Sequence, residues 1–204
     1  MADESKKPQK MPQKDRLIEA RRQYEHATLN RDQLHPDPVS QFENWLKDAR
    51  EAKLIDATAM ALTTVDRNYK PHTRMVLLKQ FDASGFTWFT DQSSAKGQQL
   101  VSNNSACILF YWRELERQVR IEGTVEKLDP AVADEYFYSR PDGSRFSAAS
   151  SNQSTTVVNR EALESRVAEL HQQYPDGNVP RPDRWGGYKP VSYTHLTLPT
   201  ICSV

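Results

Sequence analysis

Basic side chains stand at both ends of an apolar stretch in the middle of the sequence. Arg74 precedes the stretch and Lys79 follows it, and the residues between them are Met75, Val76, Leu77 and Leu78. A short apolar and partly β-branched run of this kind predicts a strand over 73–79. A charge at either end of a buried strand requires a partner or a ligand. The odd separation of the two cations predicts that they point to opposite faces of the strand.

Hydroxyl and ammonium groups follow another predicted strand, 86–90, where a short helix is expected to begin. Thr90 ends that strand, and Ser94 and Lys96 lie at the predicted helix start. Backbone N–H groups at the N-terminus of a helix favour a bound anion. These residue types in this order therefore indicate a site for an anionic ligand.

A third group of polar residues lies further along the chain. Tyr136 and Arg140 are four positions apart and are followed closely by Ser144. Residues four apart share one face of a helix, and together with the earlier cations this set suits a phosphorylated small molecule. The alternative is that they are ordinary solvated groups, because isolated Lys and Arg side chains are mostly exposed. Spacing alone leaves both interpretations open.

Other common site motifs are absent from the sequence. There is no glycine-rich GxGxxG, GxxxxGKS or GxxxxGKT loop, no HExxH metal motif and no GxSxG nucleophile elbow. The two cysteines, Cys107 and Cys202, give neither a metal-ligand spacing nor a disulfide framework. The sequence therefore argues against a Rossmann or P-loop nucleotide site, against a metal site, and against hydrolysis by an acid–base or nucleophilic residue.

The elements that must position these groups are mostly strands. Short β-rich runs separated by turns occur at 59–65, 73–79, 86–90, 106–112 and 118–128, and a further strand begins at Trp185. Strands at this spacing, joined mainly by turns, predict an antiparallel sheet or small barrel rather than alternating strands and helices. The predicted fold class is therefore α+β with mainly antiparallel β structure.

Helices are expected to flank this sheet. Asp37 before a proline marks one helix start, and its apolar stripe is Phe42, Trp45, Leu46 and Ala49. The same signal at Asp129 opens a helix that ends near Arg140, and Asn159 caps a last helix. Shorter expected segments are helices over 15–29 and 94–100 and a Ser-rich loop over 144–156.

Composition restricts the class of protein. The chain has 204 residues, with 27 basic and 27 acidic side chains and a formal net charge of zero. This balance argues against a protein that coats nucleic acid or an anionic membrane. The chain has no apolar run of the roughly 18 residues that a transmembrane helix needs, and its polar first residues do not form a secretory signal. We therefore expect a cytoplasmic protein with no nucleic-acid or membrane partner.

Several of these residues resemble the motifs of the pyridoxamine 5′-phosphate oxidase family. The similar segments are RMVLLK at 74–79, FT at 89–90, SAK at 94–96, ERQV at 116–119, YFYSRP at 136–141, QS at 153–154 and WGGY at 185–188. Motifs that recur in the same order are far more specific than any one of them. The resemblance implies an FMN-binding split β-barrel with flanking helices, assembled as a homodimer with FMN at the interface.

The resemblance also implies which residues hold the cofactor. FMN would be bound by Arg74, Met75, Val76, Leu77, Leu78, Lys79, Phe89, Thr90, Ser94, Lys96, Gln118, Gln153 and Ser154. In this family-based assignment, the cations would meet the phosphate and the ring region, and Gln118 would form a hydrogen bond with the flavin. Gln153 and Ser154 would reach the flavin from the partner subunit.

The implied substrates are pyridoxamine 5′-phosphate and pyridoxine 5′-phosphate. Both would be oxidised to pyridoxal 5′-phosphate with O2 as acceptor, giving H2O2 and, from the amine, ammonia. The substrate phosphate would be held by Lys79, Tyr136, Arg140 and Ser144, and the site would be covered by Arg21, Arg22, Gln23 and Tyr24. No side chain is assigned as catalytic, because the flavin carries the chemistry.

The sequence also departs from the family pattern. Ala95 stands where the family has Arg, and Arg145, Phe146 and Ser147 replace Gln-Ile-Gly. After Tyr188 the family's EFWQG, RLHDR and RLAP motifs do not follow. We therefore expect a disordered polar arm over 1–20, which contributes to the mean hydropathy of -0.77, a barrel domain over 21–188, and a non-native tail over 189–204. On this basis the chain should bind FMN weakly and turn over poorly or not at all. The alternative functions are a non-catalytic FMN-binding or B6-phosphate-binding split-barrel relative, or an inactive truncated form.

Overall fold

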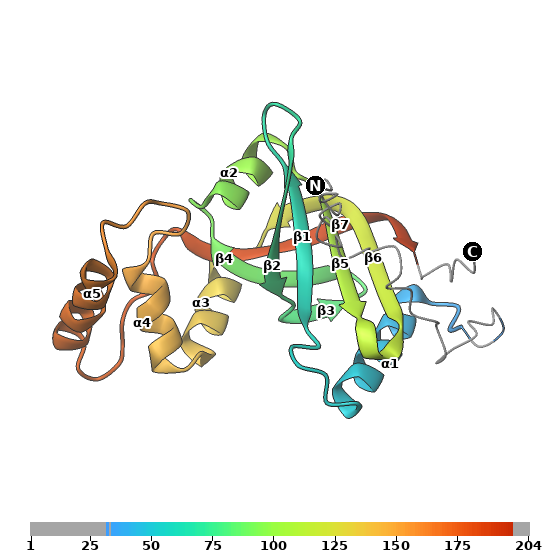
Figure 1. Cartoon of the computed structure of the whole chain (residues 1–204), viewed down its shortest axis with the longest axis horizontal. Coiled ribbons are helices and arrows are strands. Elements are labelled where there is room, and N and C mark those ends of the chain that lie inside the picture. Colours follow the sequence, from blue (N-terminus) through green and yellow to red (C-terminus); the bar gives the residue numbers. More distant parts are fainter. Residues whose placement is uncertain (1–31, 33, 198–204) are drawn as a thin grey trace, which may run out of the picture.

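A computed structural model describes residue 32 and residues 34–197, and its strands form one antiparallel sheet (Figure 1). The strands are β1 (Ala59–Val65), β2 (Pro71–Leu77), β3 (Gln80–Asp82), β4 (Gly85–Asp91), β5 (Ser105–Trp112), β6 (Arg117–Lys127) and β7 (Trp185–Thr197). Their order is β2-β1-β5-β6-β7-β4-β3, and every neighbouring pair is antiparallel. The predicted fold class is confirmed, whereas the helix predicted over 15–29 lies outside the described residues.

The helices lie at separate places around the sheet. They are α1 (Pro38–Glu51), α2 (Ala95–Ser102), α3 (Pro130–Ser139), α4 (Asp142–Ser150) and α5 (Arg160–Gln173). In Figure 1, α3, α4 and α5 gather on one side of the sheet, and α1 lies at its other end. In the part of the chain that the structure describes, no helix combines the length and the apolar character needed to span a membrane.

The interior of the barrel is an aromatic and aliphatic core that α1 closes at one end. Phe42 of α1 is fully buried, and its ring centroid lies 4.9 Å from those of both Phe86 and Phe110. In β1, buried residues alternate with partly exposed ones, so Met60 and Leu62 face the same interior. Strand alternation and the helical stripe therefore meet in one core, as the sequence pattern predicts.

A smaller apolar cluster lies beneath α3 and α4. It consists of Phe137, Phe146, Val179 and Trp185, which are all buried. Phe89 and Tyr136 pack against it from β4 and α3. This second cluster fixes α3 and α4 against the sheet, and thereby sets the position of the polar residues at the ends of these helices.

Two elements differ from the sequence prediction. Residues 142–150 form helix α4, where a Ser-rich loop over 144–156 was expected. The reason is tertiary: Phe146 is fully buried in the second cluster, which outweighs the weak helix propensity of serine. The short strand β3 is a further difference, because the sequence predicts no strand over residues 80–82, which pair with β4 in a hairpin.

The last strand extends beyond the boundary predicted at residue 188. β7 begins at Trp185, as expected, but its backbone pairs with β6 as far as Thr197, opposite Arg120. Residues 189–197 therefore belong to the sheet in the structure. The proposed domain boundaries and the non-native origin of the tail stay predictions.

Helix α3 depends on its N-cap. Asp129 accepts a hydrogen bond from the backbone N–H of Ala131 at 2.8 Å, and a proline occupies the first turn. We expect Asp129→Ala to lower the free energy of unfolding by about 1 kcal/mol, measured by urea denaturation. The exposed Glu135 on the same helix is the matched control. If Glu135→Ala lowered the free energy of unfolding as much as Asp129→Ala, this would contradict the capping role.

Candidate functional site

A cavity of ≈ 690 Å³ lies where β2, β4 and β7 approach α2, α3 and α4. Most of the predicted site residues line it, from segments far apart in the sequence. They are Arg74, Met75, Val76, Leu77, Lys79, Phe89, Thr90, Lys96, Tyr136, Arg140, Ser144, Gln153 and Ser154. The structure therefore brings the three groups of cations and hydroxyls in the sequence into one place.

The charge of the cavity has a single sign. Four of the lining residues are the cations Arg74, Lys79, Lys96 and Arg140, and none of the described lining residues is Asp or Glu. Cations gathered without carboxylates repel one another unless an anion joins them. The arrangement therefore favours a ligand with more than one negative charge over the alternative of solvated surface groups.

Lys96 is the most buried of these cations. Its Nζ donates to Thr90 Oγ1 at 3.0 Å, to Ser94 Oγ at 3.2 Å and to Gln153 Oε1, all of which are neutral acceptors. Burial, together with the nearby positive charge of Arg74, lowers the pKa of Lys96 to about 8, although Asp91 acts in the opposite direction. An anion beside Lys96 would favour its charged form.

Arg74 reaches the cavity from β2 with its guanidinium fixed. Nη1 donates to the carbonyl of Leu62 at 3.0 Å and to Thr64 Oγ1 at 2.7 Å, and Nη2 donates to Gln99 Oε1 at 3.0 Å. Burial lowers the pKa of Arg74, but a guanidinium stays protonated in proteins. Strand β1 and helix α2 therefore orient this cation without neutralising it.

The start of α2 adds backbone dipoles to the same region. Ser94 is its N-cap, but the side chain makes no cap hydrogen bond and instead donates to the carbonyl of Asp91 at 2.6 Å. The first N–H groups of a helix lack partners within the helix, and the dipole at this end favours an anion. The α2 terminus, Lys96 and Thr90 therefore form a phosphate-type end of the cavity.

Arg140 lies beside the aromatic side chains of the cavity, at the end of α3. Its guanidinium carbon lies 4.9 Å from the Trp185 ring, and burial lowers its pKa. Its Nη1 is buried without a hydrogen-bond partner among the described residues. An unsatisfied buried donor costs about 1–3 kcal/mol. A bound anion that accepts from Arg140 would remove this cost.

Three aromatic rings form a wall beside Arg140. The Phe89 ring is stacked on that of Tyr136 at 4.1 Å and on that of Trp185 at 5.3 Å, with interplanar angles of 22° and 9°. Gly187 permits this closeness, because a Cβ there would lie 2.9 Å from Cε1 of Phe89. Flat apolar walls of this kind suit planar ring systems.

Several predicted site residues lie elsewhere. Leu78 is buried in the barrel core. Ser94 does not line the cavity, but its Oγ accepts a hydrogen bond from Lys96, which does. Gln118 is exposed on β6, opposite Tyr111, and does not line the cavity. Residues 21–24 lie outside the described residues, so their assignment stays a prediction.

Two expectations about geometry are wrong. Arg74 and Lys79 do not point to opposite faces of a strand, because β2 ends at Leu77 and the Lys79 N–H donates to Thr87 of β4 at 2.9 Å. Both cations therefore line one cavity. The stretch between them is also only partly buried, since Met75 is 64% exposed and Leu77 42%, whereas Leu78 lies in the core.

Gln153 and Ser154 line the cavity of their own chain, where Gln153 Oε1 meets Thr90 and Lys96. Their assignment to the partner's site, which the resemblance implies, stays a prediction. α4, which the sequence prediction missed, carries the chain back to this point. Sequence reasoning also left Trp185 and Ala95 out of the site, although both line the cavity.

Comparison with known proteins identifies the family. The family model described as pyridoxamine 5′-phosphate oxidase matches residues 46–174. A relative from Cyanothece sp. (strain PCC 7425 / ATCC 29141), named pyridoxine/pyridoxamine 5′-phosphate oxidase, is 46% identical over 173 residues, which cover 85% of this chain and 81% of the relative. The chain belongs to the pyridoxamine 5′-phosphate oxidase family. A chloroplastic relative of similar name from Arabidopsis thaliana is 45% identical over 87% of this chain, which corresponds to 34% of that longer protein.

Solved structures agree with this assignment. PhzG from Burkholderia lata 383, in complex with tetrahydrophenazine-1-carboxylic acid, is similar with a TM-score of 0.75 and 29% identity, covering 80% of this chain and 81% of PhzG. A pyridoxamine 5′-phosphate oxidase-related, FMN binding protein from Nostoc punctiforme has a TM-score of 0.59 at 16% identity, covering 77% of this chain and 82% of that protein. The expected split-barrel fold of this family is confirmed.

Proposed function

We propose that this family member is an FMN-dependent oxidase that converts pyridoxamine 5′-phosphate or pyridoxine 5′-phosphate to pyridoxal 5′-phosphate. The observation that carries the proposal is the cavity with four cations, no carboxylate among its described lining residues, and a stacked aromatic wall. Such a cavity suits two phosphorylated planar molecules, because Arg and Lys bind phosphate and ring faces stack on aromatic side chains.

The residues present fit FMN. Lys96, Thr90 and the start of α2 would hold its phosphate, and the neutral partners of Arg74 leave that cation free to face the same dianion. Gln153 and Ser154 would add polar contacts from the loop after α4. The fit rests on the buried ammonium of Lys96, which lacks a carboxylate partner among the described residues.

The residues near the aromatic wall fit the substrate. Arg140 has a buried Nη1 in need of an acceptor, and Lys79, Tyr136 and Ser144 line the cavity with it. A substrate phosphate held by these four side chains would fix the pyridine ring relative to the flavin. Fixing two reactants in this way lowers the barrier through orientation.

The chain's own residues would orient the reactants, and the cofactor would supply the redox chemistry. That chemistry would be the transfer of a hydride equivalent from the substrate carbon that becomes the aldehyde, and of two electrons on to O2, giving H2O2. With the amine substrate, water then releases ammonia. No His, Asp or Glu occurs among the described residues that line the cavity, which agrees with a reaction that needs no acid–base pair from the protein.

A homodimer with FMN at the interface is part of this proposal. It is supported by Gln118, which the family resemblance assigns to the flavin but which lies outside the cavity of its own chain. It is also supported by the exposed apolar side chains of Met75, Leu77 and Tyr111, since homodimer interfaces are rich in such groups. Sedimentation of the FMN-loaded protein tests the assembly, and a monomer mass would contradict it.

One preparation tests the function as a whole. We expect the purified protein to quench flavin fluorescence when FMN is added in excess, which offsets the weak binding expected without the RLHDR motif, and to release H2O2 slowly when pyridoxamine 5′-phosphate is added. Unphosphorylated pyridoxamine is the matched control and should react far less, because the cations then lack their partner. A bound flavin without turnover of either B6 phosphate would favour the non-catalytic alternative, and failure to bind flavin would contradict the proposal.

A further inference from the structure

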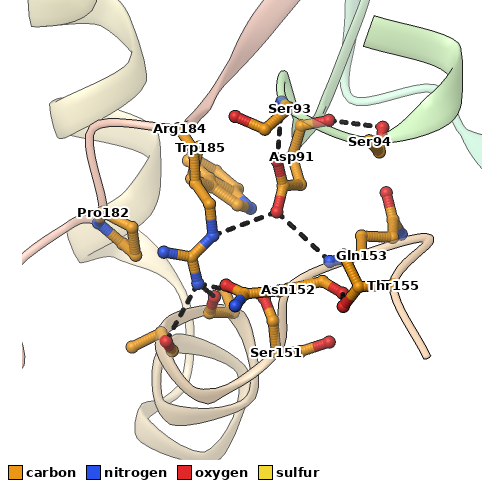
Figure 2. A network of polar contacts seen from close by, with 12 residues as sticks. Asp91, Ser93, Ser94, Ser151, Asn152, Gln153, Thr155, Pro182, Arg184 and Trp185 are labelled. Atoms are coloured by element: carbon orange, nitrogen blue, oxygen red, sulfur yellow. Dashed lines mark hydrogen bonds and ion pairs between the residues drawn. The ribbon is translucent and has the colours of Figure 1, made fainter. Parts of the chain in front are cut away.

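Arg184 lies just before β7 and joins separate parts of the chain (Figure 2). Its Nε donates to Oδ2 of Asp91, at the end of β4, at 3.0 Å. Its Nη2 donates to the carbonyl oxygens at the end of α4, at 3.3 Å to Ala148, 3.0 Å to Ala149 and 3.0 Å to Ser151. The last carbonyls of a helix lack partners within the helix. Arg184 therefore caps α4 and fixes it to β4.

Asp91 extends this network to the cavity. Its side chain is 7% exposed, and besides Arg184 it accepts from the N–H of Ser93 at 2.7 Å and from that of Gln153 at 3.3 Å. A buried carboxylate is stable only when it is paired and hydrogen-bonded, and Arg184 supplies the cation. One carboxylate thus joins the turn before α2 to the loop that carries Gln153 (Figure 2).

The loop after α4 has little packing of its own. Residues 152–159 are all exposed, and Ser154 has a φ of 68°. A non-glycine residue in this region is strained and persists only where its surroundings hold it. Gln153 Oε1 nevertheless reaches Thr90 Oγ1 at 3.0 Å and the ammonium of Lys96. The position of the Gln153 side chain therefore depends on tethers outside the loop.

We propose that Arg184 is a positioning residue for the cofactor site. Through its ion pair with Asp91 and its hold on the end of α4, it fixes the loop so that Gln153 lies beside Lys96, at the end of the cavity that takes the FMN phosphate. The identity of the ligand rests on the proposed function, whereas the placement of Gln153 does not. A neighbouring cation, Arg181, contacts Asp134 and the carbonyl of Trp185 instead, so this role belongs to Arg184.

The test compares Arg184→Ala with Arg160→Ala, which removes an arginine from an exposed pair with Glu164. FMN and riboflavin are titrated into each variant, and their dissociation constants are measured by quenching of flavin fluorescence. We expect Arg184→Ala to raise the dissociation constant of FMN about tenfold, the scale of one charge-assisted hydrogen bond. The dissociation constant of riboflavin should stay nearly unchanged, because riboflavin has no phosphate. Arg160→Ala should change neither constant.

Equal weakening of FMN and riboflavin would indicate a merely structural role and overturn the proposal, as would an unchanged FMN affinity. If Arg184→Ala does not fold because Asp91 is left buried and unpaired, the Asp91→Asn, Arg184→Ala double variant removes that charge as well. The same selective loss of FMN affinity is expected from it.

A second measurement needs no flavin. In the NMR spectrum of the ligand-free protein, the side-chain amide signals of Gln153 are identified by their disappearance in Gln153→Ala. We expect Arg184→Ala to move these signals to the positions of exposed glutamines. Unmoved signals would overturn the proposal whether or not the wild-type chain binds FMN, and failure of the wild-type chain to bind FMN would count against the proposed function alone.

Discussion

Replacing Arg140 with alanine should raise the KM for pyridoxamine 5′-phosphate by roughly 30-fold or more, because truncating one partner of a buried charge pair costs about 2–5 kcal/mol. The buried Nη1 of Arg140 has no acceptor among the described residues, and the guanidinium lies over the Trp185 ring. The Trp185 ring orients the cation before the substrate arrives, and the unpaired Nη1 leaves a donor for the substrate phosphate. Steady-state peroxide release at varied substrate concentration measures the change.

The control separates this contact from a general loss of positive charge. Arg166 is an exposed arginine on α5, and Arg166→Ala should leave KM unchanged. FMN affinity should also be unchanged in Arg140→Ala, because Arg140 lies beside the aromatic wall and Lys96 lies at the α2 end of the cavity. An unaltered KM, or an equal loss of FMN binding, would remove Arg140 from the substrate site.

The barrel could be predicted from sequence because its signals are local. β1 spans the predicted residues 59–65, where apolar residues alternate along a strand bounded by turn residues. The apolar stripe of α1 could be predicted in the same way, because Asp37 caps the helix and the apolar residues that begin with Phe42 follow one another at helical spacing. In these segments local preference and tertiary burial agree.

The elements that the sequence did not predict are those whose structure depends on contacts with residues far away along the chain. α4 has a serine-rich sequence typical of a loop, and it is helical because Phe146 is buried and Arg184 caps the last turn. The exposure of Met75 is another example, because an apolar run does not reveal which face of an edge strand is covered. Neither burial nor capping by a residue far along the chain can be read from the local pattern.

The site shows the same division. The types of its cations could be read from the sequence, because phosphate binding needs Arg, Lys and hydroxyl groups. That these cations line one cavity could not be predicted from the sequence. Lys79 reaches the cavity of Arg74 because the backbone after β2 forms a hydrogen bond with β4. The role of Trp185 depends on stacking with Phe89 across the β4–β7 pair, which a motif alone does not show.

Replacing Lys96 with methionine should lower the affinity for FMN by about 10- to 150-fold, because hydrogen bonds to charged groups contribute about 1.5–3 kcal/mol. Methionine keeps most of the apolar stem of lysine and removes the ammonium that meets Thr90, Ser94 and Gln153. Riboflavin affinity should change much less. Lys47→Met, at an exposed lysine paired with Glu51, is the control and should bind FMN normally.

The same residue predicts how FMN binding depends on pH. Burial and the charge of Arg74 lower the pKa of Lys96 to about 8 in the free site. The phosphate favours the charged form, so the pKa of Lys96 is higher in the complex than in the free protein. FMN affinity should therefore be constant below pH 8 down to the region near pH 6 where the phosphate itself gains a proton, and should fall as pH rises above 8. Lys96→Met should lack the alkaline decline while keeping the acid one, because only the first depends on the ammonium. A wild-type affinity that is flat from pH 7 to about 9.5, or an alkaline decline that persists in Lys96→Met, would show that another group binds the phosphate.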